Sequence, residues 1–187
     1  SQVQTMSMTR GTGTMRLVAC VLSILFFANA GSVVASAQDA ASAHSVEALL
    51  QSFRLADPEL QIEVAAAEPN VVDPVSVTWD EDGRMFVVEM RDYPNSAPGG
   101  TIRRLVDSDN DGTYETATVF AEALSYPSSA VPWNGGLIVA AAPDLIFLKD
   151  INGDSIADER RTLFTGFGQS VPDAQFNSLY WGSDLWI

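Results

Sequence analysis

An internal repeat constrains the fold of this chain more than any other feature. Residues 105–111 (LVDSDND) align with residues 148–154 (LKDINGD) at an offset of 43 residues. Further on, TVF at 118–120 aligns with TLF at 162–164, with one extra residue in the second copy. The same structural unit is therefore expected to occur at least twice.

A second repeated series supports this period. Trp79, Trp133 and Trp181 each precede a turn and a short apolar run, at spacings of 54 and 48 residues. A period of about 40–50 residues made of strands and turns is typical of propeller blades, which carry four strands each and stack to bury their faces. A small β-sandwich, the alternative, leaves two co-registered repeats unexplained. We interpret the three Trp side chains as blade core.

We therefore expect an all-β fold, a β-propeller represented here by about two and a half blades, since known propellers close with about 4–8. The remaining blades are expected beyond Ile187, which makes this chain an N-terminal fragment of the propeller.

Local patterns in the first unit agree with strands. Residues 75–79 (VSVTW) and 85–89 (MFVVE) are rich in β-branched and aromatic side chains, and residues 80–83 (DEDG) between them form a turn signal. Gly83 is expected to supply the positive φ that closes this turn. No long helical pattern follows residue 55, so the sequence favours a hairpin-based fold.

The N-terminal region carries different signals. Arg10 and Arg16 precede a 12-residue apolar run at 17–28, and the small-x-small triplet at 35–37 (ASA) follows it. This run is shorter than the about 20 residues that a membrane-spanning helix needs. We interpret residues 1–37 as a signal peptide cleaved before Gln38, which predicts an exported protein, periplasmic or extracellular. The alternative is an uncleaved signal that anchors the chain to the membrane.

Three segments follow from these patterns. Residues 38–56 are expected to form a linker and a short helix, because residues 45–53 place apolar side chains at i, i+3, i+4 and i+7. The alternation at 60–64 predicts a strand. Residues 57–187 are expected to form the partial β-propeller.

Composition excludes several classes of protein. The chain has 24 acidic and 10 basic residues and a net charge of −14, so a nucleic-acid partner is not expected. The single cysteine, Cys20, lies in the signal segment. The remaining chain therefore forms no disulfide and no Cys-ligated metal site, so its stability has to come from a large core or from other metals.

Two acidic loops coincide with the repeat. Counted from Asp107 and from Asp150, side-chain oxygens occur at loop positions 1, 3, 5 and 9. The candidate ligands are Asp107, Asp109, Asp111 and Glu115 in the first loop and Asp150, Asn152, Asp154 and Asp158 in the second. Alternating oxygens of this kind begin an EF-hand loop.

The loops differ from an EF-hand in two respects. Position 12 is Thr118 or Arg161, so the bidentate Glu is missing, and strands rather than helices are expected on both sides. Clustered carboxylates repel one another unless a cation or water lies between them. Flexible loops with oxygen ligands suit Ca²⁺ better than Mg²⁺, so we expect weak calcium sites, with solvated Asp-Gly turns as the alternative. Ser155, at position 6 of the second loop, must adopt a conformation that glycine prefers.

A series of motifs resembles one family over residues 45–187. The motifs, in order, are AAAEP at 65–69, VVDP at 71–74, WDEDGR at 79–84, VEMRDYP at 88–94, the DxDxDG loop, FTGFG at 164–168 and NSLYWG at 177–182. Together they resemble the N-terminal domain of proteins classed as membrane-bound dehydrogenases in planctomycetes and verrucomicrobia. That domain is similar to the soluble glucose/sorbosone quinoprotein dehydrogenases, which are six-bladed propellers.

The resemblance implies an oxidoreductase acting on sugars or alcohols with pyrroloquinoline quinone and calcium. The related enzymes use a His as base, whereas the one His here, His44, lies in the linker, so the catalytic residues are unknown. Arg91 and Tyr93 follow a predicted strand and are the candidate cofactor-binding residues, Arg91 for an anionic group and Tyr93 for stacking or hydrogen bonding. An exposed Arg91–Asp92 pair in a surface turn is the alternative.

Two functions therefore remain open. One is an exported quinoprotein-type dehydrogenase. The other is a non-enzymatic, calcium-stabilised propeller for adhesion or glycan binding, which the missing base favours. Fold alone does not decide between them.

Overall fold

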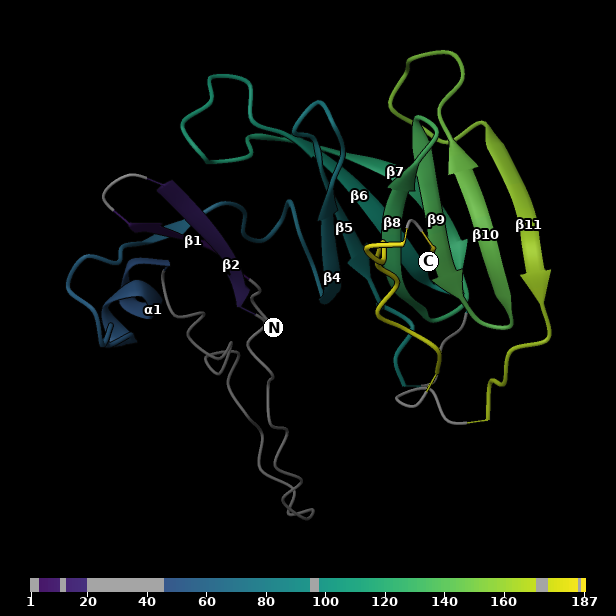
Figure 1. Cartoon of the computed structure of the whole chain (residues 1–187), viewed down its shortest axis with the longest axis horizontal. Coiled ribbons are helices and arrows are strands. Elements are labelled where there is room, and N and C mark those ends of the chain that lie inside the picture. The colour runs from purple at the N-terminus through teal and green to yellow at the C-terminus, as the bar shows by residue number, and fades with distance from the viewer. Residues whose placement is uncertain (1–3, 11–12, 20–45, 95–97, 171–174, 185) are drawn as a thin grey trace, which may run out of the picture.

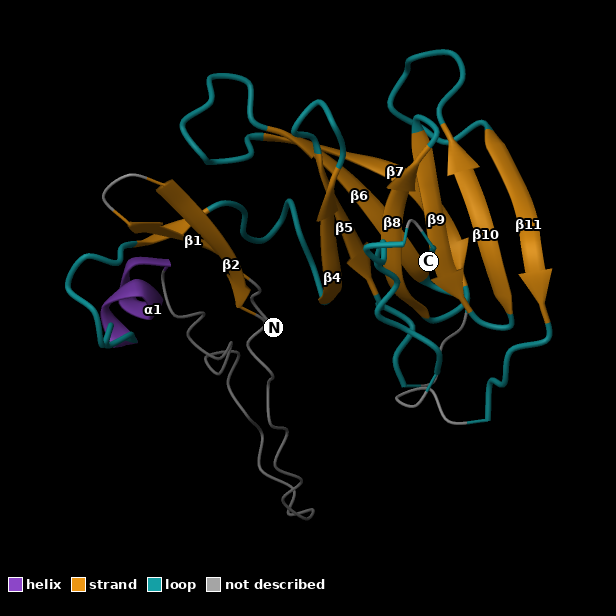
Figure 2. Ribbon diagram, viewed as in Figure 1, coloured by secondary structure: helices purple, strands orange, loops and turns teal. Residues whose placement is uncertain are grey.

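The computed structural model describes residues 4–10, 13–19, 46–94, 98–170, 175–184 and 186–187 of the chain. Two four-stranded antiparallel sheets form the main body, as Figures 1 and 2 show. The first sheet has the order β4-β5-β6-β7 and contains β4 (Pro74–Trp79), β5 (Met85–Glu89), β6 (Gly100–Val106) and β7 (Thr116–Leu124). The second contains β8 (Pro127–Trp133), β9 (Gly136–Ala141), β10 (Asp144–Lys149) and β11 (Glu159–Thr165), with β8 and β11 at its edges.

Each sheet is a meander in which consecutive strands pair. Residues 125–126 connect β7, the last strand of the first sheet, directly to β8, the first strand of the second. β8 in turn contacts β4 and β5. The two sheets are thus the two copies of the repeat that the sequence predicts, and the mostly β fold is confirmed.

The main core lies between the two sheets. Its buried side chains come from one face of each sheet: Phe86, Val88, Ile102, Phe120 and Leu124 from the first, and Ala130, Leu137, Val139, Ala141, Ile146 and Leu148 from the second. Phe86 and Phe120 meet edge to face with ring centroids 5.2 Å apart. Burial of this many large apolar side chains is the main stabilising contribution to the pair of sheets.

The local expectations for the first hairpin are confirmed. β4 and β5 occupy the predicted strand positions, with Trp79 paired to Met85. Gly83 has a φ of 79°, and its N–H donates to Asp80 O at 3.1 Å, which closes the predicted turn.

A smaller element group lies at the N-terminal end. The helix α1 (Val46–Ser52) and the strand β3 (Ile62–Val64) occur where the sequence predicts them. β3 joins β1 (Gln4–Arg10) and β2 (Gly13–Ala19) in a sheet of order β2-β1-β3. Residues 20–45, with most of the expected apolar signal core and the cleavage site, lie outside the described residues, so the signal peptide stays a prediction. In the described part of the chain, no helix has the length and apolar character to cross a membrane.

The C-terminal residues lie along β8, an edge strand of the second sheet. Leu179 N donates to Ser129 Oγ at 3.1 Å, and Trp181 Nε1 donates to Pro132 O at 3.1 Å. Ser128 Oγ donates to Phe176 O at 2.7 Å. The third copy of the Trp series therefore lies along β8, although no strand is assigned to the described residues of this segment.

Candidate metal centres

The two acidic loops occupy equivalent places in the two sheets. The first connects β6 to β7 and the second connects β10 to β11, so each joins the third strand of its sheet to the fourth. Both project from the same end of the sheets (Figure 1). The two loops that align in the sequence therefore also occupy equivalent positions in the structure.

In the first loop, four carboxylates converge. Asp107, Asp109, Asp111 and Glu115 each offer an oxygen, and these oxygens all lie within 4.8 Å of one another. Asp107 is half-buried and the other three are exposed. No basic side chain of the described residues forms an ion pair with any of the four, and Asp107 Oδ1 is buried without a hydrogen-bond donor. This arrangement suits a cation that accepts oxygen ligands.

The second loop repeats the arrangement with one carboxylate fewer. Asp150, Asp154 and Asp158 offer oxygens within 4.8 Å of one another. Asn152 takes the place of Asp109, and its Nδ2 donates to Asp158 Oδ1 at 2.9 Å and to Asp154 Oδ2 at 3.2 Å. The amide N–H groups thus stabilise two of the carboxylates, a role that a bound cation would otherwise have.

Backbone hydrogen bonds shape both loops in the same way. The carboxylate at position 1 accepts from the N–H at position 6, at 2.9 Å in the first loop (Asp107, Gly112) and 2.8 Å in the second (Asp150, Ser155). The acidic side chain at position 9 accepts from the N–H at position 2, Ser108 or Ile151, at 3.1 and 2.9 Å. These bonds fold each loop back on itself and point the acidic side chains toward one centre.

Two positions in each loop have left-handed backbone. Position 4 is Asn110 with φ of 61° or Gly153 with φ of 86°, and position 6 is Gly112 with φ of 96° or Ser155 with φ of 76°. The prediction that Ser155 adopts a conformation favoured by glycine is confirmed. Each loop thus has one non-glycine residue in this conformation, Asn110 or Ser155. The conformation costs about 1–2 kcal/mol for most residues, and Asn tolerates it better than Ser, so the second loop is the more strained of the two.

The environment of Asp150 favours its charged form. Burial raises the pKa of its carboxyl group. Hydrogen bonds from the N–H groups of Gly153 and Ser155 and the nearby Arg104 guanidinium together lower the pKa by more than burial raises it, so the pKa lies below its usual value. Asp150 is therefore ionised at neutral pH and available as a metal ligand.

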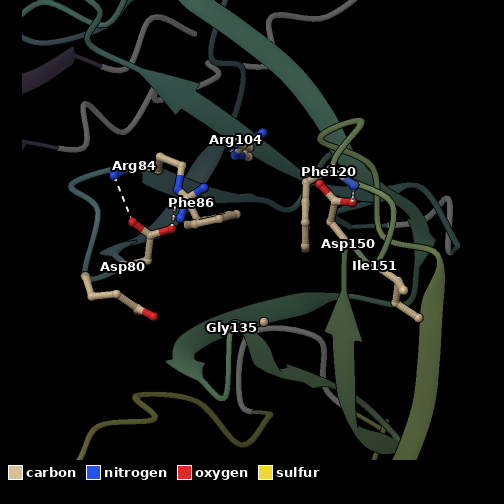
Figure 3. A pocket seen from close by; sticks show the side chains of 11 residues that line it. Asp80, Arg84, Phe86, Arg104, Phe120, Gly135, Asp150 and Ile151 are labelled. Atoms are coloured by element: carbon tan, nitrogen blue, oxygen red, sulfur yellow. Dashed lines mark hydrogen bonds and ion pairs between the residues drawn. The ribbon is translucent and has the colours of Figure 1, made fainter.

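A cleft of about 230 Å³ lies between the two sheets beside the second loop. Figure 3 shows Asp80 and Arg84 on one side and Asp150 on the other, with Phe86 and Phe120 between them. Arg84 Nε donates to Asp80 Oδ2 at 2.7 Å. Arg104, from β6, hydrogen-bonds through Nη1 to Ser155 Oγ, so the cleft is bridged by contacts from the first sheet to the loop of the second.

The candidate cofactor residues Arg91 and Tyr93 have different environments. Arg91 Nε donates to Glu89 Oε2 at 2.8 Å, and Tyr93 is 53% exposed. Asp92 is fully buried, where its Oδ2 accepts from Tyr126 N at 2.8 Å and from Gly99 N at 3.3 Å. The alternative of an exposed Arg91–Asp92 pair is wrong, because Asp92 instead ties the β5–β6 loop to the start of β8.

Glu89 is a buried residue that sequence reasoning missed. It is 0% exposed; its Oε1 accepts from Val72 N at 2.8 Å, and its Oε2 accepts from Thr101 Oγ1 at 2.6 Å. Arg103 Nε lies 3.5 Å from the same Oε2 but makes no hydrogen bond there. Two guanidinium groups, those of Arg91 and Arg103, thus lie against one carboxylate. Strand β5 is buried on both faces, so the continuous apolar run MFVV that precedes Glu89 is the signal that could have indicated it.

The Trp residues are less buried than expected. Trp79 packs at the margin of a core cluster, and its Nε1 donates to Tyr114 Oη at 2.9 Å. Trp133 is 39% exposed and Trp181 is 42% exposed, so their interpretation as core is wrong for the described residues. Trp133 lies on the face of the second sheet that carries Phe147, whose ring it meets edge to face.

Fold and site together define an antiparallel β protein with repeated four-stranded sheets, each carrying one acidic loop. The chain belongs to the family described as a domain of unknown function, DUF7133, which matches residues 45–187. No curated protein and no solved structure matches the chain. The family description assigns no activity, so the resemblance to dehydrogenases stays a prediction.

Proposed function

We propose that the two sheets are successive blades of an exported β-propeller and that each acidic loop binds one Ca²⁺ ion. The observation that carries the proposal is the equivalence of the loops: carboxylates at positions 1, 5 and 9 converge within 4.8 Å at the same place in both sheets. A single acidic turn is common on protein surfaces, but a repeated one with the same hydrogen bonds points to a shared ligand.

Calcium fits the loops better than magnesium. The available oxygens belong to exposed or half-buried carboxylates in irregular backbone, which adapt to the variable coordination of Ca²⁺. Mg²⁺ requires near-octahedral geometry and retains several waters. Because no bidentate Glu occurs at position 12, we expect dissociation constants of about 10⁻⁴–10⁻³ M, the range of extracellular modules.

The stacking of the sheets supports the propeller. The last strand of one sheet leads directly into the first strand of the next, and β8 lies against β4 and β5. In a propeller, successive four-stranded meanders stack in this way around an axis. Residues 176–181, which lie alongside β8, are then the beginning of the next blade.

Direct calcium titration tests the proposal. Isothermal titration of the protein is expected to give two sites, with the first loop the tighter because it has four carboxylates. Asp111→Asn should remove the first site and Asp154→Asn the second, whereas Asp144→Asn, outside both loops, should leave two. A protein that takes up no calcium at millimolar concentration refutes the metal assignment.

Quinone-dependent oxidation of a sugar or alcohol is the second candidate function. The observation that favours it is the pair of guanidinium groups, Arg91 and Arg103, beside the single carboxylate of Glu89, since guanidinium groups suit an anionic group such as a cofactor carboxylate. Pyrroloquinoline quinone would supply the oxidising group when bound, and Tyr93 is exposed close to Arg91 in the sequence.

Titration with pyrroloquinoline quinone, followed by dye reduction with sugars, separates the two functions. If the candidate is right, Arg91→Ala and Arg103→Ala each weaken quinone binding by about tenfold or more. The control Arg54→Ala, at an exposed arginine outside the sheets, leaves it unchanged. Absence of quinone binding leaves the non-enzymatic propeller for adhesion or glycan binding.

A further inference from the structure

Two backbone hydrogen bonds relate the acidic loops to the segments that precede each sheet. In the second loop, Ala157 N donates to Phe120 O, in β7, at 2.8 Å. In the first loop, Tyr114 N donates to Ala65 O, directly after β3, at 2.7 Å. Tyr114 and Ala157 both occupy position 8 of their loops. Ala65 therefore has the same place relative to the first sheet that Phe120 in β7 has relative to the second.

Packing extends this equivalence. Phe120 and Leu124 share a core cluster with Leu137, Val139 and Leu148 of the second sheet. On the first sheet, the corresponding positions are Met85, Val87 and Leu105, and they share a cluster with Ala65, Ala66 and Val71. The segment that begins with β3 thus covers the first sheet, just as β7, the last strand of the first sheet, covers the second sheet. In a blade, this last strand is the outermost one.

One part of the second interface has no counterpart in the first. The second sheet also packs against Phe86, Val88 and Ile102, which belong to the inner strands β5 and β6 of the preceding sheet. Among the described residues, the cluster on the first sheet contains no side chain from the inner strands of a preceding sheet. Arg103, which pairs with Val87 as Ile146 pairs with Val139, has its Nε buried there without a hydrogen-bond acceptor.

The pairing edge of β3 is already able to accept a strand. β1 lies antiparallel on it, with Met6 opposite Val64 and Met8 opposite Ile62. In the first sheet, β6 lies on β7 in the same way. β1 belongs to the segment expected to be removed on export, and its removal would leave the β3 edge unpaired.

We propose that residues 62–66 are the outermost strand of a further blade, and that a later blade of the same polypeptide supplies the three inner strands that pair with β3. The incoming sheet pairs antiparallel with β3 and presents a carboxylate to Arg103, whose side chain is still partly exposed. Before export, β1 occupies the edge that this sheet needs. The inference rests on the blade arrangement proposed above and is independent of calcium.

Hydrogen–deuterium exchange of the complete natural protein, without residues 1–37, tests the proposal. Amides of residues 62–66 should exchange at least about 100-fold more slowly than in an unstructured peptide, as slowly as those of β7. Free exchange of residues 62–66 beside a protected β7 overturns the proposal. Protection that disappears on dilution, together with a dimeric mass, also overturns it, because a second copy then supplies the strands.

A matched pair of variants checks the pairing edge. Successive N–H groups of a strand point to opposite edges, so one of Glu63→Pro and Val64→Pro removes a pairing donor and the other an outward-facing donor. One variant should abolish the protection of residues 62–66 while the other retains it. Equal behaviour of both contradicts the proposal. Repeating the exchange in EDTA distinguishes failure of the strand pairing from failure of the metal sites. If residues 62–66 stay protected but the protein takes up no calcium, only the metal sites are refuted.

Discussion

At the scale of single residues, the sixth position distinguishes the two acidic loops. Gly112 in the first loop and Ser155 in the second both have left-handed backbone, which suits glycine but strains serine. The Ser155 hydroxyl offsets part of this cost through its hydrogen bond with Arg104. Strain and contact at this position can be separated by substitution.

Replacing Ser155 by alanine and by glycine makes that separation. Both variants lose the bond to Arg104, but only glycine relieves the backbone. We expect Ser155→Gly to be more stable than Ser155→Ala by about 1 kcal/mol, measured by urea denaturation. Equal stability of the two variants would mean that the left-handed conformation of Ser155 carries no cost.

Glu89 is expected to be the most sensitive acidic residue of the first sheet. Glu89→Ala leaves Arg103 partly buried without its carboxylate and should lower the free energy of unfolding by about 3 kcal/mol. Glu122→Ala, at an exposed side chain of β7, is the control and should change it by less than about 0.5 kcal/mol. Similar values for both would show that the Glu89 network does not stabilise the fold.

The lowered pKa of Asp150 predicts a pH dependence in the metal-free protein. Because its pKa is lower in the folded state than in the unfolded state, its contribution to stability is present above the unfolded pKa of about 3.8 and is lost as the pH falls through the folded value. In EDTA at pH 7, the melting temperature of the wild type should therefore be higher than that of Asp150→Asn. The difference between the two melting temperatures should shrink below pH 4. A gap that widens on acidification has the wrong sign.

Sequence reasoning identified the residues with strong local patterns and missed those defined by tertiary contacts. The spacing of Asp107 to Glu115 suffices to predict convergence, since a short loop cannot separate such side chains. By contrast, the RDYP segment resembles an exposed turn, and only the docking of Tyr126 against Asp92 buries that carboxylate. Long-range partners of this kind leave no periodic signal in one sequence.

At the scale of elements, the tight β8–β9 turn depends on a close approach at Gly136. A Cβ atom there would lie 2.3 Å from Leu148 O and 2.9 Å from the Phe147 ring. Gly136→Ala should therefore lower stability by about 1–3 kcal/mol through displacement of β10. Gly168→Ala, where no atom lies within 4 Å, is the control and should be neutral in the same thermal melts. A stable Gly136→Ala protein would contradict this packing.

Strand bounds were the most predictable feature at this scale. The DEDG turn between two β-branched runs determines β4 and β5, because turn chemistry and alternation agree there. The partner of β3 was not predictable, since three residues of alternation specify a strand but not its neighbour. Its pairing with β1 joins segments more than fifty residues apart.

At the scale of the whole molecule, the repeat predicted the stacking of the two sheets but not a closed ring. The outer face of the second sheet still presents Trp133, and residues 176–181 lie along β8 without completing a blade. Closure depends on pairing between distant segments, which local patterns do not encode. We therefore propose that calcium in the two equivalent loops stabilises the stacked sheets.

The most direct test is thermal melting of the protein in EDTA and at increasing calcium concentration, with magnesium as the control. The proposed sites predict that the melting temperature rises over about 10⁻⁴–10⁻² M Ca²⁺, because an ion that binds only the folded state stabilises it by mass action. The combined variant Asp111→Asn, Asp154→Asn should lose this rise. A melting temperature that is the same in EDTA and in calcium would contradict the account.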